Sequence, residues 1–337
     1  MKKQDGIVHH VTEADDGQTL AAFLRARLEA ASWSRVQKLV RGRHVLIHGN
    51  LCTDAARRLK EGEVVKVLAA AAAAPPRATD VRVVHVDADV VVVDKPTGIT
   101  TTRHHEEASW PARRRQVQPT LEEMVPQAIA AHLARRQATG PHAARPAPPR
   151  GRRVPPVRAV HRIDRETSGL VVFARTVPAG RILAEQFRLH DTHRRYLALV
   201  TGRVAAGTIR TRLVRDRGDG RRGSTDEEAG KLAVTHVAPL EHFGDAYTLV
   251  ECRLETGRTH QIRIHMAETG HPVCGERVYA AMRRDAAPDE SRAPRVMLHA
   301  AELGFVHPTS GASLRFTAPL PADMRAVLDR LRRSGRS

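Results

Sequence analysis

The stretch HRIDRETSGL covers residues 161–170 and stands before an apolar run that ends at Ala174. It places a histidine, two arginines, two acidic residues and two hydroxyl side chains at the start of a segment that is typical of a buried strand. Two interpretations stay open on spacing alone. Either these polar side chains satisfy a turn that Gly169 allows to bend, or Asp164 is a reactive carboxylate that the neighbouring arginines keep ionised.

Other kinds of chemistry have weaker support in the sequence. A hydrolase triad of His161, Asp164 and Ser168 is disfavoured, because triads are assembled from distant segments and the chain has no Gly-x-Ser-x-Gly motif. The chain also has no Walker motif, no Gly-x-Gly-x-x-Gly and no His-Glu-x-x-His, and its three cysteines are scattered. We therefore expect no metal site.

Outward from this stretch, apolar strands alternate with helices. Strands are expected at 81–96 (a pair around a turn), 170–174, 194–202, 231–257 (a second pair), 296–308 and 312–319, and helices at 121–135, 178–190, 258–270 and 322–332. Strands with adjacent connections and interspersed helices favour antiparallel pairing. We predict an α+β fold with a mixed, largely antiparallel central sheet and flanking helices, in a domain that spans 81–333.

A small α/β unit precedes that domain. Helices are expected at 18–31 and from an N-cap at Ser34 to Gly42, followed by two or three short strands up to residue 68. Basic side chains gather on and after the second helix: Arg35, Lys38, Arg41 and Arg43. We predict a domain at 15–70 with a phosphate-facing surface, a flexible tail at 1–14 and an alanine- and proline-rich linker at 71–80. A merely solvated helix face is the alternative.

The charge of the chain is strongly positive. Its 337 residues carry a formal net charge of +18, mostly from arginine. A basic surface gathers phosphates, so this balance indicates a polyanionic partner, with solvated surface charge as the alternative. No N-terminal signal core and no run of about 18 apolar residues is present, so we expect a cytoplasmic monomer that does not contact membranes.

Together, these segments resemble pseudouridine synthases of the RluA class. The resemblance rests on HRID with TSGL at 161–170, on VVVDKPTGI at 91–99, on RRYLALVTG at 194–202, on LETGRTHQIRIHMAETGHPVCGERVY at 254–279 and on MLHAAELGFVHP at 297–308. Through SRVQKLVRGRHVLIHGN and KEGEVVKV, the N-terminal unit is similar to the RNA-binding domain named after ribosomal protein S-four. The resemblance implies the pseudouridine synthase fold and the isomerisation of uridine in RNA without a cofactor.

The resemblance also implies roles for single residues. Asp164 would be the catalytic aspartate, which either attacks the nucleoside or helps to remove a sugar proton. Tyr196 would pack on the uracil and assist loss of the proton from C5, and Arg263 would pair with Asp164 and keep it ionised. Arg162 would enter the RNA in place of the flipped-out uridine.

Further residues of the matching segments are expected to contribute to RNA binding. Lys95 would contact phosphate, with a simple end to its strand as the alternative. His260 and Gln261 would position the loop at the RNA interface rather than take part in the chemistry.

Two departures from the family pattern bear on the substrate. Gly275-Glu276 stands where the family usually has Gly-Asp, and an Arg- and Pro-rich insertion occupies about 103–158. The arginines of that insertion, Arg145, Arg150, Arg152 and Arg153, either extend the RNA surface or belong to a passive loop. Large-subunit ribosomal RNA is the expected substrate, because members with this N-terminal domain often act there, and transfer RNA is the runner-up. A non-catalytic RNA-binding or ribosome-assembly factor is the rival interpretation.

Overall fold

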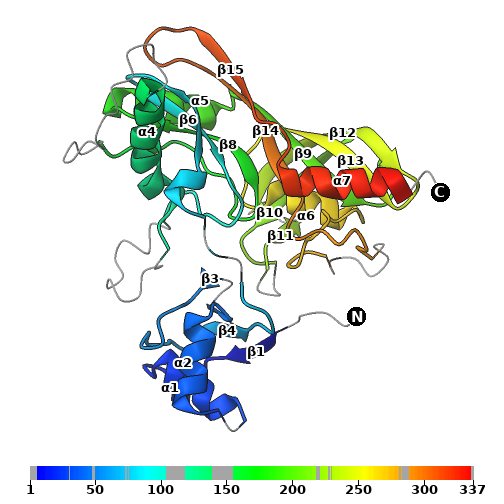
Figure 1. Ribbon diagram of the computed structural model, residues 1–337. Helices are drawn as coiled ribbons and strands as arrows, with labels where there is room; N and C mark the ends of the chain where they lie inside the picture. The colour runs from blue at the N-terminus through cyan, green and yellow to red at the C-terminus, as the bar shows by residue number, and fades with distance from the viewer. Residues whose placement is uncertain are drawn as a thin grey trace. The chain divides into compact units, whose positions relative to one another are not determined.

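The computed structural model describes residues 6–29, 31–47, 50–72, 74, 76–103, 118–138, 155–217, 221–226, 228, 230–280, 282 and 288–334. The chain divides into two compact units, one formed mainly by residues 1–75 and the other by residues 76–102 and 120–337 (Figure 1). Arg145, Arg150, Arg152 and Arg153, which the sequence offers as an extension of the RNA surface, lie outside the described residues.

The small unit packs two helices against a four-stranded sheet of order β1-β4-β2-β3. Its elements are β1 (Ile7–His10), η1 (Glu13–Asp15), α1 (Leu20–Arg27), α2 (Trp33–Arg41), β2 (Val45–Ile47), β3 (Asn50–Leu51) and β4 (Val64–Val67). Phe23 and Leu24 of α1 and Val36 of α2 are fully buried together with apolar residues of the strands. The two helices bury one apolar face each, and this forms the core of the unit.

Two expectations for this unit are wrong in detail. The segment expected as a flexible tail contains β1, which pairs antiparallel with β4 and thereby becomes an edge strand of the sheet. The N-cap of α2 is Ser32 rather than Ser34, because the Ser32 hydroxyl accepts a hydrogen bond from the backbone N–H of Arg35 at 3.2 Å. Ser34 lies inside the first turn.

The large unit is built on one mixed sheet, 11-stranded in the described residues, with the order β11-β10-β12-β13-β9-β14-β8-β6-β5. In addition, β7 pairs with β8 and β15 with β14. The strands are β5 (Arg82–Val86), β6 (Val90–Lys95), β7 (Arg158–Ala159), β8 (Ser168–Ala174), β9 (His193–Thr201), β10 (Gly207–Val214), β11 (Gly223–Thr225), β12 (Lys231–Phe243), β13 (Tyr247–Leu254), β14 (Leu298–Val306) and β15 (Ser313–Thr317). The pair β14–β8 is parallel and the other pairs are antiparallel, which confirms the predicted fold class.

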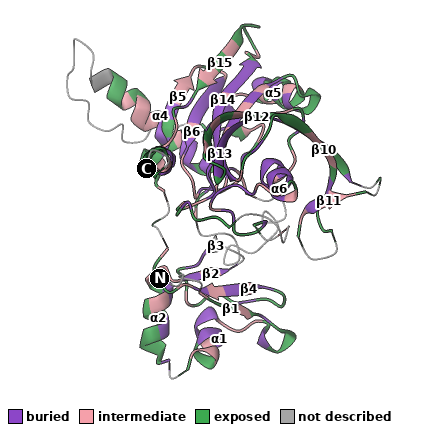
Figure 2. Ribbon diagram, turned by 90° about the vertical axis from the view of Figure 1, so that its right-hand side faces the viewer, coloured by how far each residue is buried: buried purple, intermediate pink, exposed green. Residues whose placement is uncertain are grey.

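Helices cover both faces of the middle of this sheet. They are α4 (Leu121–Ala138), α5 (Val177–Leu189), α6 (Gln261–Glu268) and α7 (Ala322–Ser334), and η2 (Ala78–Asp80) precedes the first strand. Along β6, Val91 packs in one core with residues of α4, whereas Val92 packs in a second core with residues of α5. The uninterrupted apolar runs of β6 and β8 therefore follow from burial on both faces. Figure 2 shows the buried residues of β6 in purple.

Three further details complete the comparison with the sequence. The helix α4, which the sequence places inside the 103–158 insertion, contributes Leu121 and Val125 to the main core of the unit. The sequence did not predict β10 and β11, whose residues are largely exposed or half-buried. In the described part of the chain, no helix is both long and apolar enough to cross a membrane.

Candidate active site

The loop before β8 carries Asp164 and is fixed through its backbone. The hydroxyl of Thr101 donates to the carbonyl of Ile163 at 2.7 Å, and the backbone N–H of Gly98 donates to the carbonyl of Arg165 at 2.7 Å. These contacts bracket Asp164, whose side chain remains 16% exposed. The segment after β6 thus holds the loop in place while the carboxylate stays accessible.

Lys95, at the end of β6, holds the same loop from inside the protein. It is completely buried, and its Nζ donates to the carbonyls of Pro96 (3.1 Å), Ile99 (2.9 Å) and Arg165 (3.2 Å). Burial lowers the pKa of Lys95 to about 7. The expectation that Lys95 contacts an RNA phosphate is wrong, because the side chain is enclosed and its donors bind backbone carbonyls.

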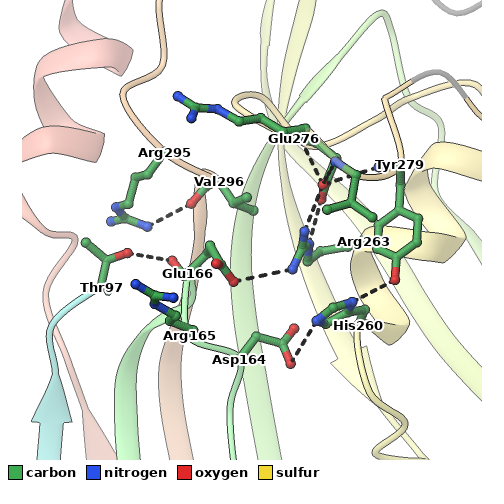
Figure 3. A network of polar contacts seen from close by, with 12 residues as sticks. Thr97, Asp164, Arg165, Glu166, His260, Arg263, Glu276, Tyr279, Arg295 and Val296 are labelled. Atoms are coloured by element: carbon green, nitrogen blue, oxygen red, sulfur yellow. Dashed lines mark hydrogen bonds and ion pairs between the residues drawn. The ribbon is translucent and has the colours of Figure 1, made fainter. Parts of the chain in front are cut away.

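Arg263 of α6 forms an enclosed ion pair beside the loop (Figure 3). Its Nε and Nη2 donate to the two carboxylate oxygens of Glu276 at 2.6 and 2.8 Å, and the two side chains are 3% and 0% exposed. Burial opposes the charge of Arg263, but the hydrogen bonds and charge of Glu276 outweigh it and raise the pKa of Arg263, helped by Asp164 and Glu166. Nη1 of Arg263 lies 3.6 Å from Glu166 Oε2.

The expected direct pair between Arg263 and Asp164 is therefore absent in the described residues. Glu276 occupies the Nε–Nη2 edge of the guanidinium, and Nη1 faces Glu166. Arg263 still acts on Asp164 through space, since the Asp164 charge contributes to the raised pKa of Arg263.

The side chain of His260 approaches Asp164 from the start of α6. Its Nε2 lies 4.0 Å from Asp164 Oδ1, and its Nδ1 lies 2.7 Å from the hydroxyl of Tyr279. Burial lowers the pKa of His260, and the charge of Asp164 offsets part of that shift. His260 has φ 59°, a left-handed conformation that is uncommon outside glycine and is often found at functional sites.

Gln261 has a structural position directly after His260. Its Oε1 accepts from the hydroxyl of Thr256 at 2.8 Å and from the backbone N–H of Arg258 at 3.0 Å, and its Nε2 donates to the carbonyl of Val234 and the hydroxyl of Thr235, both at 3.0 Å. The amide has thus used its donors and acceptors within the protein. Gln261 therefore positions the start of α6.

A cavity of about 490 Å³ lies in front of Asp164 and is also lined by Arg162 and Tyr196. Tyr196 is 9% exposed on β9, and its pKa is raised by burial and, to a smaller extent, by the charge of Asp164. Arg162 is exposed. A planar ligand that enters this cavity can therefore meet an aromatic ring, a carboxylate and a guanidinium together.

The predicted basic surface of the small unit is present as a helix face. Arg35, Lys38 and Arg41 are exposed and recur every three residues along α2. Arg43 follows the helix with φ 66° and is half-buried. Within the described ranges, no group of three or more His, Cys, Asp or Glu side chains is placed to hold a metal ion.

Comparison with known proteins gives this arrangement its context. Residues 89–268 match the model of the family described as RNA pseudouridylate synthase, and residues 18–65 match the S4 domain. The chain is 34% identical, over 96% of its length and 91% of the relative's, to "Ribosomal large subunit pseudouridine synthase D" of Xanthomonas campestris. The chain belongs to the RNA pseudouridylate synthase family. It is a pseudouridine synthase, an intramolecular isomerase, with an N-terminal S4 RNA-binding domain.

Two further relatives support this assignment and the fold. The synthase is 32% identical, over 96% of its length and 93% of the relative's, to "Ribosomal large subunit pseudouridine synthase D" of Salmonella typhimurium. The solved structure of "Human RNA Pseudouridylate Synthase Domain Containing 4" covers 74% of the synthase and 93% of its own chain, with a TM-score of 0.55 and 22% identity. This structural likeness shows a common fold and confirms the predicted fold class.

Three residues of the synthase site were not identified from the sequence. Glu166 lies two residues after Asp164, but nothing in its spacing indicates that it faces Arg263. Glu276 stands out only as a departure from the Gly-Asp pattern. Tyr279, three residues after Glu276 and only 2% exposed, contacts His260 Nδ1 through its hydroxyl. Only the folded chain brings these residues together.

Proposed function

We propose that this synthase converts specific uridines of large-subunit ribosomal RNA into pseudouridine, with Asp164 as the catalytic carboxylate. The observation that carries the proposal is the cavity that Asp164, Tyr196 and the exposed Arg162 line together. The choice of RNA is supported by the full-length relatives, whose names refer to the ribosomal large subunit.

The reaction is an isomerisation, so no atom is gained or lost. The bond between N1 of uracil and C1′ of ribose breaks, the base turns, a bond forms between C5 and C1′, and the proton lost from C5 is balanced by one gained at N1. Asp164 acts first, either by attack on the nucleoside or by removal of a sugar proton. Tyr196 packs against the uracil and assists loss of the C5 proton.

The remaining residues of the site bind the RNA or position the carboxylate. Arg162 occupies the space that the flipped uridine leaves, since the reacting atoms are unreachable in a stack. His260 limits the movement of Asp164 on the side that faces α6. Arg263, enclosed by Glu276, supplies positive charge near the carboxylate.

The S4 domain supplies a second contact to the same RNA. The exposed basic residues of α2 bind phosphates, and they fix the position of the RNA without reading its sequence. Folded RNA presents readable bases in loops and bulges, so the target uridines lie there.

Pseudouridine mapping of total cellular RNA tests this proposal, with cells that carry the native gene compared with cells that carry Asp164→Asn. We expect a few uridines of large-subunit ribosomal RNA to lose modification in the variant. Losses confined to transfer RNA would keep the reaction and contradict the substrate. An unchanged map would support the rival interpretation of a non-catalytic RNA-binding factor.

A further inference from the structure

The active-site cavity contains a buried arginine to which the steps above assign no role. Arg194 lines the cavity with Tyr196, two residues further along β9, and it is 9% exposed. Side chains two residues apart lie on the same face of a strand, about 6.6 Å from each other. A Cβ at Gly257 would lie 2.9 Å from Nη1 of Arg194, so the glycine leaves the space that this guanidinium occupies.

Arg194 has few partners for a buried charge. Its Nη2 donates to the carbonyl of Glu255 at a long 3.4 Å, and its Nε is buried without a hydrogen-bond partner. Its guanidinium carbon is 6.0 Å from the centre of the Phe187 ring. Among the described residues, no carboxylate forms an ion pair with it. A buried cation in this state is costly unless an anion joins it.

Arg195, the next residue on the strand, differs from Arg194 because it has carboxylate partners. Arg195 points to the opposite face of β9, where it pairs with Glu251 and, at 2.8 Å, with Glu302. The histidines near Arg194 do not compensate its charge either. Burial together with the charge of Arg194 lowers the pKa of His161 to about 3, which keeps that imidazole neutral.

We propose that Arg194 binds a backbone phosphate of the nucleotide whose uracil packs on Tyr196. The inference rests on the RNA-modifying function proposed above. A guanidinium presents two parallel N–H groups that match phosphate oxygens, and a bound phosphate supplies the anion that the buried arginine needs. Arg194, Tyr196 and Asp164 line the same cavity, so one bound nucleotide can meet all three.

This role differs from a structural one in what it predicts for the protein without RNA. If Arg194 served only to hold the loop at Glu255, its loss would lower the melting temperature and would leave the salt dependence of the reaction unchanged. A phosphate-binding arginine has the opposite signature. Its loss removes an uncompensated charge from the free protein and one phosphate contact from the complex.

The test compares full-length wild-type protein with Arg194→Gln and Arg194→Lys, and uses Arg195→Gln as the matched control. The probe is total RNA from cells that lack the gene, and the measurement is the initial rate of pseudouridine formation at limiting RNA over a series of salt concentrations. We expect Arg194→Gln to lose roughly ten- to hundredfold in rate, the effect of a hydrogen bond to a charged group. Its slope of log rate against log salt should fall by about one.

The other variants complete the comparison. Arg194→Lys should keep the wild-type slope with a smaller loss of rate, and Arg195→Gln should keep the wild-type slope. Arg194→Met fills a similar space without charge and replaces the glutamine variant if that one does not fold. A wild-type slope in the uncharged variant together with a lowered melting temperature would overturn the inference. If wild-type protein forms no pseudouridine in this RNA, the proposed function fails and the inference fails with it, whereas modification of transfer RNA alone changes only the substrate.

Discussion

Arg263 and Glu276 form a bidentate ion pair, with N···O distances of 2.6 and 2.8 Å, that is almost completely enclosed by the protein. The pair joins α6 to the turn that follows it. The guanidinium is therefore committed to Glu276, and Asp164 has no direct guanidinium contact in the part of the chain that the structure describes. A carboxylate that acts as nucleophile or base benefits from this arrangement, because a tight ion pair would have to break before it reacts.

Glu276→Gln should destabilise the protein by about 3–5 kcal/mol, because it leaves the buried Arg263 charge without its partner. Glu276→Asp keeps a carboxylate and serves as the matched control with a smaller loss. Burial opposes the charge of Glu276, but the hydrogen bonds and charge of Arg263 prevail and lower its pKa. The stabilisation is therefore present above the pKa of the unfolded carboxyl and is lost as the pH falls through the folded value. Urea unfolding at neutral and acidic pH measures both effects, and equal stability of Glu276→Gln and wild type would contradict the prediction.

Lys95 also makes the stability of the protein depend on pH, but through burial rather than through an ion pair. Burial lowers its pKa to about 7 in the folded protein. In the unfolded chain a lysine keeps its proton up to about pH 10.4. Between these values the unfolded state binds more protons, so stability rises with pH by at most about 1.4 kcal/mol per pH unit. Urea unfolding of wild type and Lys95→Met from pH 7 to pH 9 isolates this effect, and a stability difference that stays constant with pH would contradict it.

Gly169, at the start of β8, is required by the close parallel pairing with β14. Its φ is 114°, and a Cβ at this position would lie 2.2 Å from the carbonyl oxygen of Ala300. Gly169→Ala should therefore cost about 3 kcal/mol or more. Gly180→Ala in α5 is the control. Its Cβ would meet Ala174 Cβ at 3.5 Å and Arg158 Cδ at 3.7 Å, both ordinary contacts, and helix propensity predicts a gain of about 0.5–1 kcal/mol. Thermal melting compares the two, and similar melting temperatures would refute the argument.

The basic face of α2 should account for part of the RNA affinity. The triple variant Arg35→Gln, Lys38→Gln and Arg41→Gln removes three exposed charges, and we expect the slope of log affinity against log salt to decrease by about two to three. The control replaces Arg27 and Arg57 of the same unit by Gln. These two pair with Asp15 and Glu63 at 2.6 and 2.8 Å, so their loss should affect stability rather than the slope. Filter binding to ribosomal RNA gives both slopes, and equal slopes for the two variants would exclude this surface.

Some strands and helices of the chain can be predicted from the local sequence pattern, because local burial produces that pattern. The apolar runs of β6 and β8 and the helical spacing of α2, α5 and α7 could be predicted, since burial on one or two faces leaves a period in the sequence. The resemblance of separate motifs identified the family, with Asp164 as its expected catalytic residue. The exposed strands β10 and β11 were missed because half-exposed residues leave a weak pattern.

The partners of the site residues depend on the tertiary structure. The sequence alone determined the class of fold, the reaction family and the stretch that contains Asp164, the proposed catalytic carboxylate. It did not determine that Lys95 is enclosed by carbonyls or that Arg263 pairs with Glu276. It also did not determine that Arg194 is buried beside Tyr196 with no carboxylate partner among the residues that the structure describes. The order of the strands in the sheet decides which segments meet, and burial decides how strongly a charged side chain needs a partner. Neither the strand order nor the burial of a single charge is encoded in the spacing of residues along one strand or helix.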